Sequence, residues 1–452
     1  FKGARLSLMI FLCASPVSTL PILGESQIEL DSSGQDFCGS KLVAENLPLV
    51  KRAVANNVFS LGSQKAAFVL LNFQNDANNR PWSVGDVATS LTTVNDYFYE
   101  ASYHQTNLTG DVKGWYTVPF NSSTDCNTLV NSISDIPFSG PKLAGVDFNS
   151  YDRIVFLFPT ISCSWAGLGQ VGGQQTMSFI NGNYSPKVIA HELGHGFAMG
   201  HAGYSLCSGP NPLGSECGLV EYGDPSDAMG NLHMGHFNAF HKERLGWLDG
   251  IDTPTIQLIN QTVTLLLEPY EVFSKNVKAL KVLKSIQSDG SQSFYYLEFR
   301  QPVGFDADLS RSRYKGNLFN GVLIHTGNSR HYDSSVLLDM TPSTPFADDS
   351  ALEEGHTFSD NAAPNGGVAF TVNSISPAGA NITVKFGALT TGVVPSQVNL
   401  NVDCAVIRNG NDTSIRCNTK PYRNGVDYSG GPTSAQAMYS LLVSLVALHS
   451  TY

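Results

Sequence analysis

The stretch HELGHGFAMGH, residues 191–201, holds three of the chain's eleven histidines. It opens with the pattern HExxH, in which two histidines and a glutamate share one side of a helix. At 3.6 residues per turn, His191 and His195 lie one turn apart, so both imidazoles can reach a single metal ion. Glu192 lies on nearly the same side, close enough to contact a metal-bound water without binding the metal. The sequence therefore predicts a helix that carries a zinc (Zn2+) site.

A third zinc ligand is needed, and His201 is the first candidate. The chain must turn back between His195 and His201, and the residue at position 198 is alanine. In a left-handed turn, alanine costs about 1–2 kcal/mol more than glycine. The alternative third ligand is a carboxylate further along the chain, for which Glu216 and Glu221 are the nearest. Both choices stay open on the residues alone.

Two segments together resemble a known peptidase family. HELGHGFAMGHA is similar to the extended HExxHxxGxxH motif of the metzincin zinc peptidases. EYGDPSDAMGNLHMGHFNAFHKERLGWL, residues 221–248, resembles the gametolysin (M11) family, as do YYLEFRQPVGFD and LEEGHTFSD later in the chain. The resemblance covers residues 185–388 well and residues 60–184 loosely. At position 198 the chain departs from the motif, which has glycine there.

The resemblance implies roles for five side chains. His191, His195 and His201 would bind zinc, Glu192 would be the general base, and Met229 would be the structural methionine of a turn beneath the metal. Three neutral imidazoles leave one coordination position for water, whose pKa the metal lowers. Glu192 would take the proton from this water and pass it to the leaving amine. The implied activity is hydrolysis of peptide bonds.

Four further residues near the motif are weaker candidates. Tyr222 lies in the loop leading to Met229 and is a candidate donor to the oxyanion, although simple packing also explains it. His233, His236 and His241 form a second histidine cluster. We interpret these three as surface or core-edge positions on a helix that follows the methionine turn.

The region around the motif predicts an α/β domain. Residues 65–74 and 151–162 are continuous apolar runs typical of buried strands, and residues 83–103 have helical spacing. The glycine-rich stretch 167–175 is expected to be a loop. The metal-binding helix should start at Ser185, because serine caps helices and proline suits the first helical position. We therefore expect an α/β metzincin-like catalytic domain, a twisted sheet with an active-site helix, over residues 59–250.

The pattern changes after residue 250. Short runs typical of strands recur, with turn residues between them and no long helical period. They include TIQLI, VKALKVLK, SFYYLEFR, GVLIHTG, VAFTVNSI and NITVKFG. This pattern predicts an all-β sandwich domain over residues 251–390.

Both ends of the sequence differ from these two regions. Two basic residues and the apolar run LSLMIFLCAS are typical of a signal peptide, predicted for residues 1–22, and residues 23–58 follow as an N-terminal or pro-segment. Residues 391–431 are interpreted as a polar linker. The apolar tail 432–452 is consistent with a GPI-anchor signal, or with a helix docked on the protein surface.

Cysteine spacing indicates disulfides. Cys207–Cys217 and Cys404–Cys417 would close short loops, and Cys126–Cys163 is the next pair predicted. Cys38 is the candidate for the cysteine left over. Its thiolate could occupy the fourth zinc position and silence the enzyme, although QDFCGSK lacks the prolines and arginine that flank such switches, and a structural disulfide is the simpler alternative.

The composition fits an exported protein, secreted or held at the cell surface by the GPI anchor. Only 14% of residues are charged, and the sequence holds six sequons for N-glycosylation, at Asn107, Asn121, Asn183, Asn260, Asn381 and Asn411. The net charge of −11 and the lack of a long basic run argue against nucleic acid and anionic membranes as partners. The expected partner is a protein or glycoprotein substrate, and the family resemblance implies extracellular or cell-wall glycoproteins. The oligomeric state stays open.

Two other functions compete with that of a secreted zinc endopeptidase. One is a catalytically inactive metzincin-like module that binds glycoprotein, and the other is a zinc hydrolase acting on a non-peptide substrate. The presence of Glu192 argues against loss of activity, because an inactive scaffold has no need of the base.

Overall fold

The structure is a computed structural model. It describes residues 58–387, except 231–232, 249–252, 312–315, 343 and 345, and the strands at 36–41, 399–409, 412–423 and 426–427. The chain divides into two compact units, one up to residue 389 and one from residue 390. The predicted signal peptide, most of the pro-segment, the apolar tail and Asn411 lie outside the described residues.

The first sheet of unit 1 contains the strands predicted around residues 65–74 and 151–162. Its order is β1 (Asp36–Lys41), β5 (Trp165–Gln170), β6 (Thr176–Asn181), β4 (Arg153–Phe158), β2 (Gly62–Phe73) and β3 (Thr106–Val118). Neighbours run parallel, except that β5 and β6 are antiparallel. The apolar runs of β2 and β4 are buried because helices cover both faces of the sheet, as parallel sheets require.

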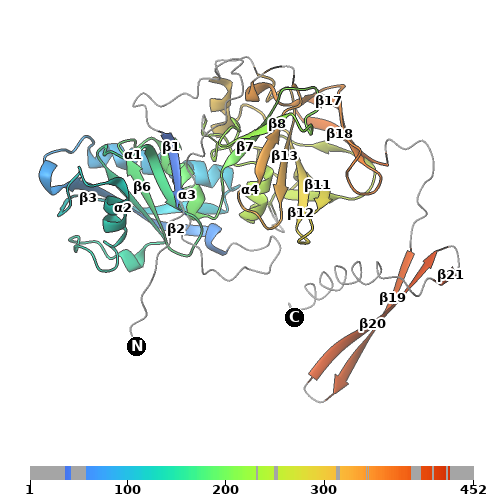
Figure 1. Ribbon diagram of the computed structural model, residues 1–452, viewed down its shortest axis with the longest axis horizontal. Coiled ribbons are helices and arrows are strands. Elements are labelled where there is room, and N and C mark those ends of the chain that lie inside the picture. Colours follow the sequence, from blue (N-terminus) through green and yellow to red (C-terminus); the bar gives the residue numbers. More distant parts are fainter. Residues whose placement is uncertain are drawn as a thin grey trace. The chain divides into compact units, whose positions relative to one another are not determined.

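Helices on the two faces follow the alternation of side chains along β2. Ala66, Phe68 and Leu70 pack with α1 (Val84–Ala101) and α3 (Pro186–Gly196). Ala67, Val69 and Leu71 point the other way and pack with α2 (Cys126–Ser134). Figure 1 shows α1 and α3 beside the sheet. The α/β prediction for this region is confirmed.

One predicted loop is in part a strand. The glycine-rich stretch 167–175 begins inside β5, which runs from Trp165 to Gln170. Glycine is depleted in strands, so the run of glycines indicated a loop. They occur in β5 because the strand lies close against the helix that carries the metal motif. At its outer edge β5 pairs with β1, where Cys38 lies opposite Gly167 in the ladder.

Two more sheets share a second core in unit 1. The larger has the order β8 (Cys217–Val220), β7 (Ala202–Cys207), β14 (Ser335–Leu338), β13 (Gly321–Asn328), β12 (Gln292–Glu298), β11 (Val277–Ile286) and β9 (Thr255–Ile259), with β15 (Leu352–Glu353) on β13. The smaller has the order β10 (Val263–Leu267), β18 (Gly379–Phe386), β17 (Val368–Ser376) and β16 (Thr357–Asp360). Apolar residues of both sheets, such as Val282, Ile324, Phe370 and Ile382, form one cluster.

The larger sheet crosses the expected boundary at residue 250. Strands β7 and β8 precede this boundary, yet β7 pairs in parallel with β14, which lies beyond it. In Figure 1, β7 and β8 accordingly lie beside β13. Residues 251–390 as a separate domain stay a prediction.

The remaining elements are short. Helix α4 spans Ala239–Arg244, and single turns of 3-10 helix lie at Val58–Ser60, Gln74–Asp76, Phe148–Ser150 and Ala347–Asp349, with a longer one at Gly304–Arg311. Of the helices that the structure describes, none is both long and apolar enough to cross a membrane. In unit 2, part of the predicted linker forms three strands, β19 (Asn399–Asn409), β20 (Asp412–Arg423) and β21 (Val426–Asp427), in which Cys404 and Cys417 lie opposite each other.

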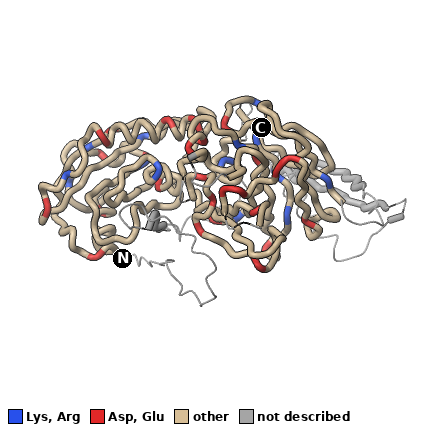
Figure 2. The backbone as a smooth tube through the Cα atoms, turned by 90° about the horizontal axis from the view of Figure 1, so that it is seen from above, with Lys and Arg blue, Asp and Glu red and all other residues tan. Residues whose placement is uncertain are grey.

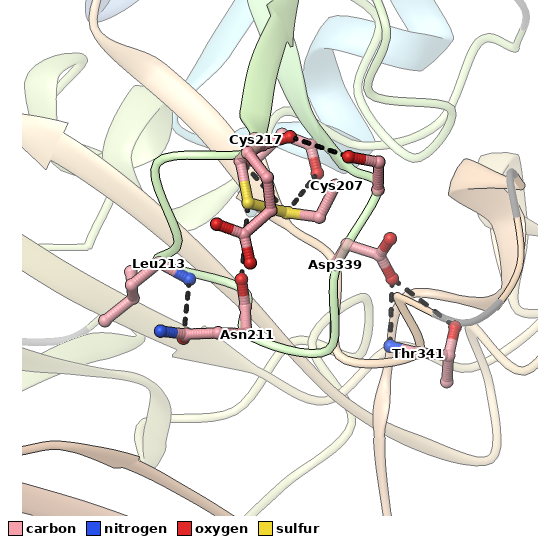
Figure 3. The surroundings of a disulfide bond; sticks show 9 residues. Cys207, Asn211, Leu213, Cys217, Asp339 and Thr341 are labelled. Carbon is pink, nitrogen blue, oxygen red and sulfur yellow. Dashed lines mark hydrogen bonds between the residues drawn. A yellow bond between two sulfur atoms is a disulfide. The ribbon is translucent and has the colours of Figure 1, made fainter.

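Two of the predicted disulfides are present. Cys126–Cys163 links the start of α2 to the segment before β5. Cys207–Cys217 closes the hairpin of β7 and β8, and Asn211 in the connecting loop accepts the N–H of Leu213 at 3.0 Å (Figure 3). Such short covalent loops restrict the unfolded chain and hold the hairpin in register.

Charged residues of both signs are spread along the described chain (Figure 2), and one group of them is fully buried. Arg300 donates to Glu298 Oε1 at 2.8 Å, to Asp306 Oδ2 at 2.6 Å and to the carbonyl of His236 at 2.9 Å. Burial alone would lower the pKa of Arg300, but Asp306 and Glu298 outweigh burial and hold it above its ordinary value. This network joins β12 to the segment that follows Met229.

We predict that Arg300→Met lowers the free energy of unfolding by about 3–5 kcal/mol, because two carboxylates would stay buried without their cation. Urea denaturation of the purified protein measures this. Arg330→Met is the matched control: Arg330 is half exposed, and its loss should change stability by less than about 1 kcal/mol. Equal effects of the two substitutions would contradict this account of the network.

Candidate metal centre

The metal motif lies on a fully formed helix. Ser185 caps α3 by accepting the N–H of Val188 at 3.4 Å, and Pro186 occupies the first helical position, as the sequence predicts. Every residue from Val188 to Gly196 is buried. Because the helix packs on the first sheet, His191 and His195 are held rigidly on one of its faces.

Three imidazoles converge at the end of this helix. One nitrogen each of His191, His195 and His201 lies within 4.8 Å of the others, and the Nε2 atoms of His195 and His201 are 3.2 Å apart. The Nδ1 atom of each ring has its own partner on the opposite side. These partners are the carbonyl of Ala228 at 2.8 Å, the carbonyl of Met199 at 2.9 Å and Glu221 Oε1 at 2.8 Å, respectively.

This donor set suits zinc. With Nδ1 bound to an acceptor, each ring carries its proton there and presents Nε2 as a lone-pair donor. Burial also lowers the pKa of all three histidines: that of His191 well below its ordinary value, that of His195 to about 3, and that of His201 despite the opposing effect of Glu221. Neutral imidazole is the form that binds a metal ion.

Ala198 makes the turn for which the motif uses glycine. Its φ is 69°, in the left-handed region. The N–H of Ala198 donates to the carbonyl of His195 at 2.7 Å, and that of Met199 donates to the carbonyl of Gly194 at 3.2 Å. The helix therefore ends and the chain reverses within the motif, which brings His201 to the other two histidines. No shift of the turn to a neighbouring glycine is needed.

Met229 lies directly against the metal helix. It is fully buried, and its Sδ occupies the space that a side chain at position 194 would need. Asp227 shapes this turn: its Oδ1 accepts the N–H of Met229 at 2.6 Å, and its Oδ2 accepts the N–H of Asn238 at 2.7 Å. Nothing in the sequence singled out Asp227, because its partners are the backbone N–H groups of Met229 and Asn238 and the imidazole of His241, which the fold brings to it.

One comparison with known proteins identifies the family of this chain. The family model of gametolysin peptidase M11 matches residues 80–339, more than half of the chain, including the three histidines, Glu192 and Met229. The chain belongs to the gametolysin peptidase family.

Beyond the gametolysin family model, the matches are weak. No curated protein matches the sequence. Among solved structures, the chain is similar to metalloproteinase-II from Bacteroides fragilis, with 12% identity, a TM-score of 0.29, and coverage of 45% of this chain and 59% of that chain. The chain thus spans less than two thirds of the length of that structure.

Glu192, the predicted general base, lies beside β5. Its side chain is fully buried, and a Cβ at Gly167 would overlap its carboxylate. A Cβ at Gly169 would lie 2.7 Å from the Glu192 carbonyl. The glycines of β5 therefore leave space for Glu192. The sequence pattern of this stretch did not indicate that role.

Tyr222 and Glu221 both contact the third histidine. Tyr222 has a left-handed φ of 60°, and its ring centroid lies 3.8 Å from that of His201. Its role as an oxyanion donor stays a prediction. Glu221, considered above as an alternative ligand, instead binds the Nδ1 atom of His201, and Glu216 lies beside Gly209 and Gly214 in the hairpin loop.

The second histidine cluster is more buried than expected. Only His241 lies on a helix, α4, and its Nδ1 contacts Asp227 Oδ2 at 2.8 Å. His236 is fully buried, with Nε2 2.9 Å from Glu100 Oε1 and Nδ1 3.1 Å from Lys242 Nζ. The expectation of surface or core-edge positions is therefore wrong for these two. Carboxylates distant in the sequence make their burial possible. His233 is partly buried, and its Nδ1 lies 3.5 Å from Asp308 Oδ2.

Gly167→Ala should lower catalytic rate without removing the metal. The new methyl group displaces the carboxylate of Glu192, whereas the three histidines keep their partners. We expect kcat to fall at least about 10-fold, since an ångström-scale misplacement of a catalytic group is costly. Peptide hydrolysis and metal content of the same preparation would be measured together. Loss of metal in parallel with activity would contradict this explanation.

Ala198→Gly should stabilise the protein. Glycine adopts the left-handed turn without the penalty of about 1–2 kcal/mol that alanine carries, and part of this gain is offset by the greater freedom of glycine in the unfolded chain. The expected net gain is about 0.5–1 kcal/mol in denaturant unfolding. Ala190→Gly, in the interior of α3, is the control and should destabilise by about 1 kcal/mol. A destabilised Ala198→Gly variant would show that the turn is not strained.

Proposed function

We propose that the chain is a zinc-dependent endopeptidase that uses Glu192 as its general base. The observation that carries this proposal is the convergence of three imidazoles at the end of α3, two buried and one partly buried, beside a glutamate that does not take part in the cluster. Among the described residues no fourth side chain joins these three histidines, and three protein ligands are typical of catalytic zinc sites, whereas structural zinc sites use four.

The chain's own residues divide the work of the reaction. His191, His195 and His201 would hold the zinc ion, which would supply Lewis-acid polarisation of the scissile carbonyl and lower the pKa of water toward neutrality. Glu192 takes the proton of the attacking water and delivers it to the nitrogen of the leaving amine. Gly167 leaves the space in which the Glu192 carboxylate lies, and the burial of this carboxylate excludes competing water.

The proposed setting is outside the cell. The disulfides Cys126–Cys163 and Cys207–Cys217 favour an oxidising compartment, and the sequons and the N-terminal signal pattern are consistent with export. We propose extracellular or cell-wall glycoproteins as substrates, by analogy with the family. The two-sheet region would form a β-sandwich domain, and a GPI signal in the tail would hold the enzyme at the cell surface.

We predict that the purified protein degrades casein or gelatin, and that a chelator abolishes this activity until zinc is added back. Glu192→Gln should lower the rate by about 10²–10⁴-fold while keeping its zinc, because general-base catalysis is lost and the ligands are intact. His195→Ala should lose both zinc and activity. Proteolysis assays and zinc analysis on the same samples measure these outcomes.

Other results would point to the competing functions. If wild type and Glu192→Gln were equally inert toward proteins and both bound glycoprotein, the chain would be a binding module. Hydrolysis of small esters with no cleavage of any peptide would indicate a zinc hydrolase of non-peptide substrates. Proteolysis that resists chelation would exclude the metal mechanism altogether.

A further inference from the structure

The three histidines of the proposed zinc site are held by different kinds of partner. His191 and His195 contact backbone carbonyls, whereas His201 contacts a carboxylate, Glu221 Oε1, at 2.8 Å. We propose that Glu221 is a positioning residue that orients His201 and strengthens it as a zinc donor. This inference rests on the proposed zinc site and adds to it a residue for which the motif makes no provision.

The fold brings Glu221 to His201 through a single hairpin. His201 immediately precedes β7, and Glu221 immediately follows β8. The two strands are antiparallel, with Tyr204 opposite Val220 and Cys207 opposite Cys217. Glu221 therefore lies beside His201 at the open end of the hairpin, and the disulfide Cys207–Cys217 closes the other end (Figure 3).

The geometry distinguishes positioning from ligation. Glu221 binds Nδ1, on the side of the ring away from the Nε2 atom that approaches His195. It is not among the residues whose ligand atoms converge. Tyr222 covers the face of the same ring, with centroids 3.8 Å apart. The imidazole of His201 is thus held at one edge by Glu221 and on one face by Tyr222.

A carboxylate at Nδ1 has two consequences for the metal. It fixes the proton on Nδ1, so that the lone pair of Nε2 points to the ion, and its charge makes the ring a stronger donor. Such partners typically contribute 10–100-fold to metal affinity, and the side chain of Glu221 is 63% exposed, where water weakens the interaction. We therefore expect an effect near the lower end, about 10-fold.

The test is the zinc dissociation constant, measured by competition with a chromogenic chelator. Glu221→Ala should bind zinc about 10-fold more weakly than wild type, and Glu221→Gln should lie between them, because the amide accepts the hydrogen bond without the charge. Glu216→Ala is the matched control, since it removes a carboxylate from the same hairpin, away from His201, and should leave affinity unchanged. His201→Ala gives the effect of losing a ligand.

A second measurement reports the geometry directly. In the cobalt-substituted protein, the visible absorption bands should shift in Glu221→Ala and not in Glu216→Ala, because the orientation of one ligand has changed. A general loss of structure would instead lower the thermal midpoint in parallel, so the midpoint of each variant is recorded alongside its spectrum.

A failure of this inference can be distinguished from a failure of the proposed function. Equal zinc affinity and equal cobalt spectra for wild type and Glu221→Ala would overturn this inference and leave the proposed function intact. A loss of zinc in Glu221→Ala as complete as in His201→Ala would make Glu221 a ligand, contrary to the inference. If the wild-type protein bound no zinc, the proposed function would fail first, and the inference with it.

Discussion

The reversal of the chain at the end of α3 is the constraint on which the metal centre depends. A helix can present two imidazoles one turn apart, but it cannot present a third toward the same point without ending. Here the helix ends at Gly196, the backbone turns left-handed at Ala198, and His201 returns to the site. The strain of an alanine in this conformation is tolerated because the surrounding packing fixes the turn.

The local parts of this arrangement could be predicted from the sequence. These parts depend on residues that are close together in the sequence. They are the helix start at Ser185, the shared face of His191 and His195, and the buried strands β2 and β4. The resemblance to the family favoured His201 over the carboxylates and supplied Met229. The structure adds the physical reason for each, namely the turn at Ala198 and the contact of Met229 with α3.

The parts that could not be predicted depend on contacts distant in the sequence. Position 167 of β5 carries glycine, and a larger side chain there would overlap the carboxylate of Glu192. Local strand propensity does not include this distant contact. His236 and His241 are buried because Glu100 and Asp227 meet them in the fold. Glu221 was considered as a ligand, since sequence spacing cannot show which side of an imidazole a carboxylate will approach.

Within unit 1, the segments that form the site also pair with strands beyond residue 250. β7 leaves His201 and pairs with β14, and Arg300 on the far side binds the carbonyl of His236, which follows the turn of Met229. The strands beyond residue 250 therefore pack against the segments that carry and follow the histidine cluster. The change in sequence pattern at residue 250 suggested a domain boundary there. The ladder between β7 and β14 joins residues on the two sides of this boundary.

The disulfide of the β7–β8 hairpin has a consequence for assembly of the metal centre. It lies between the third histidine and the carboxylate that meets that histidine, so it closes the loop that brings the two together. Part of the entropy lost in bringing these two side chains together is therefore already given up in the oxidised chain. In a reduced chain, α3 would still hold two histidines in place, but the third would be less constrained.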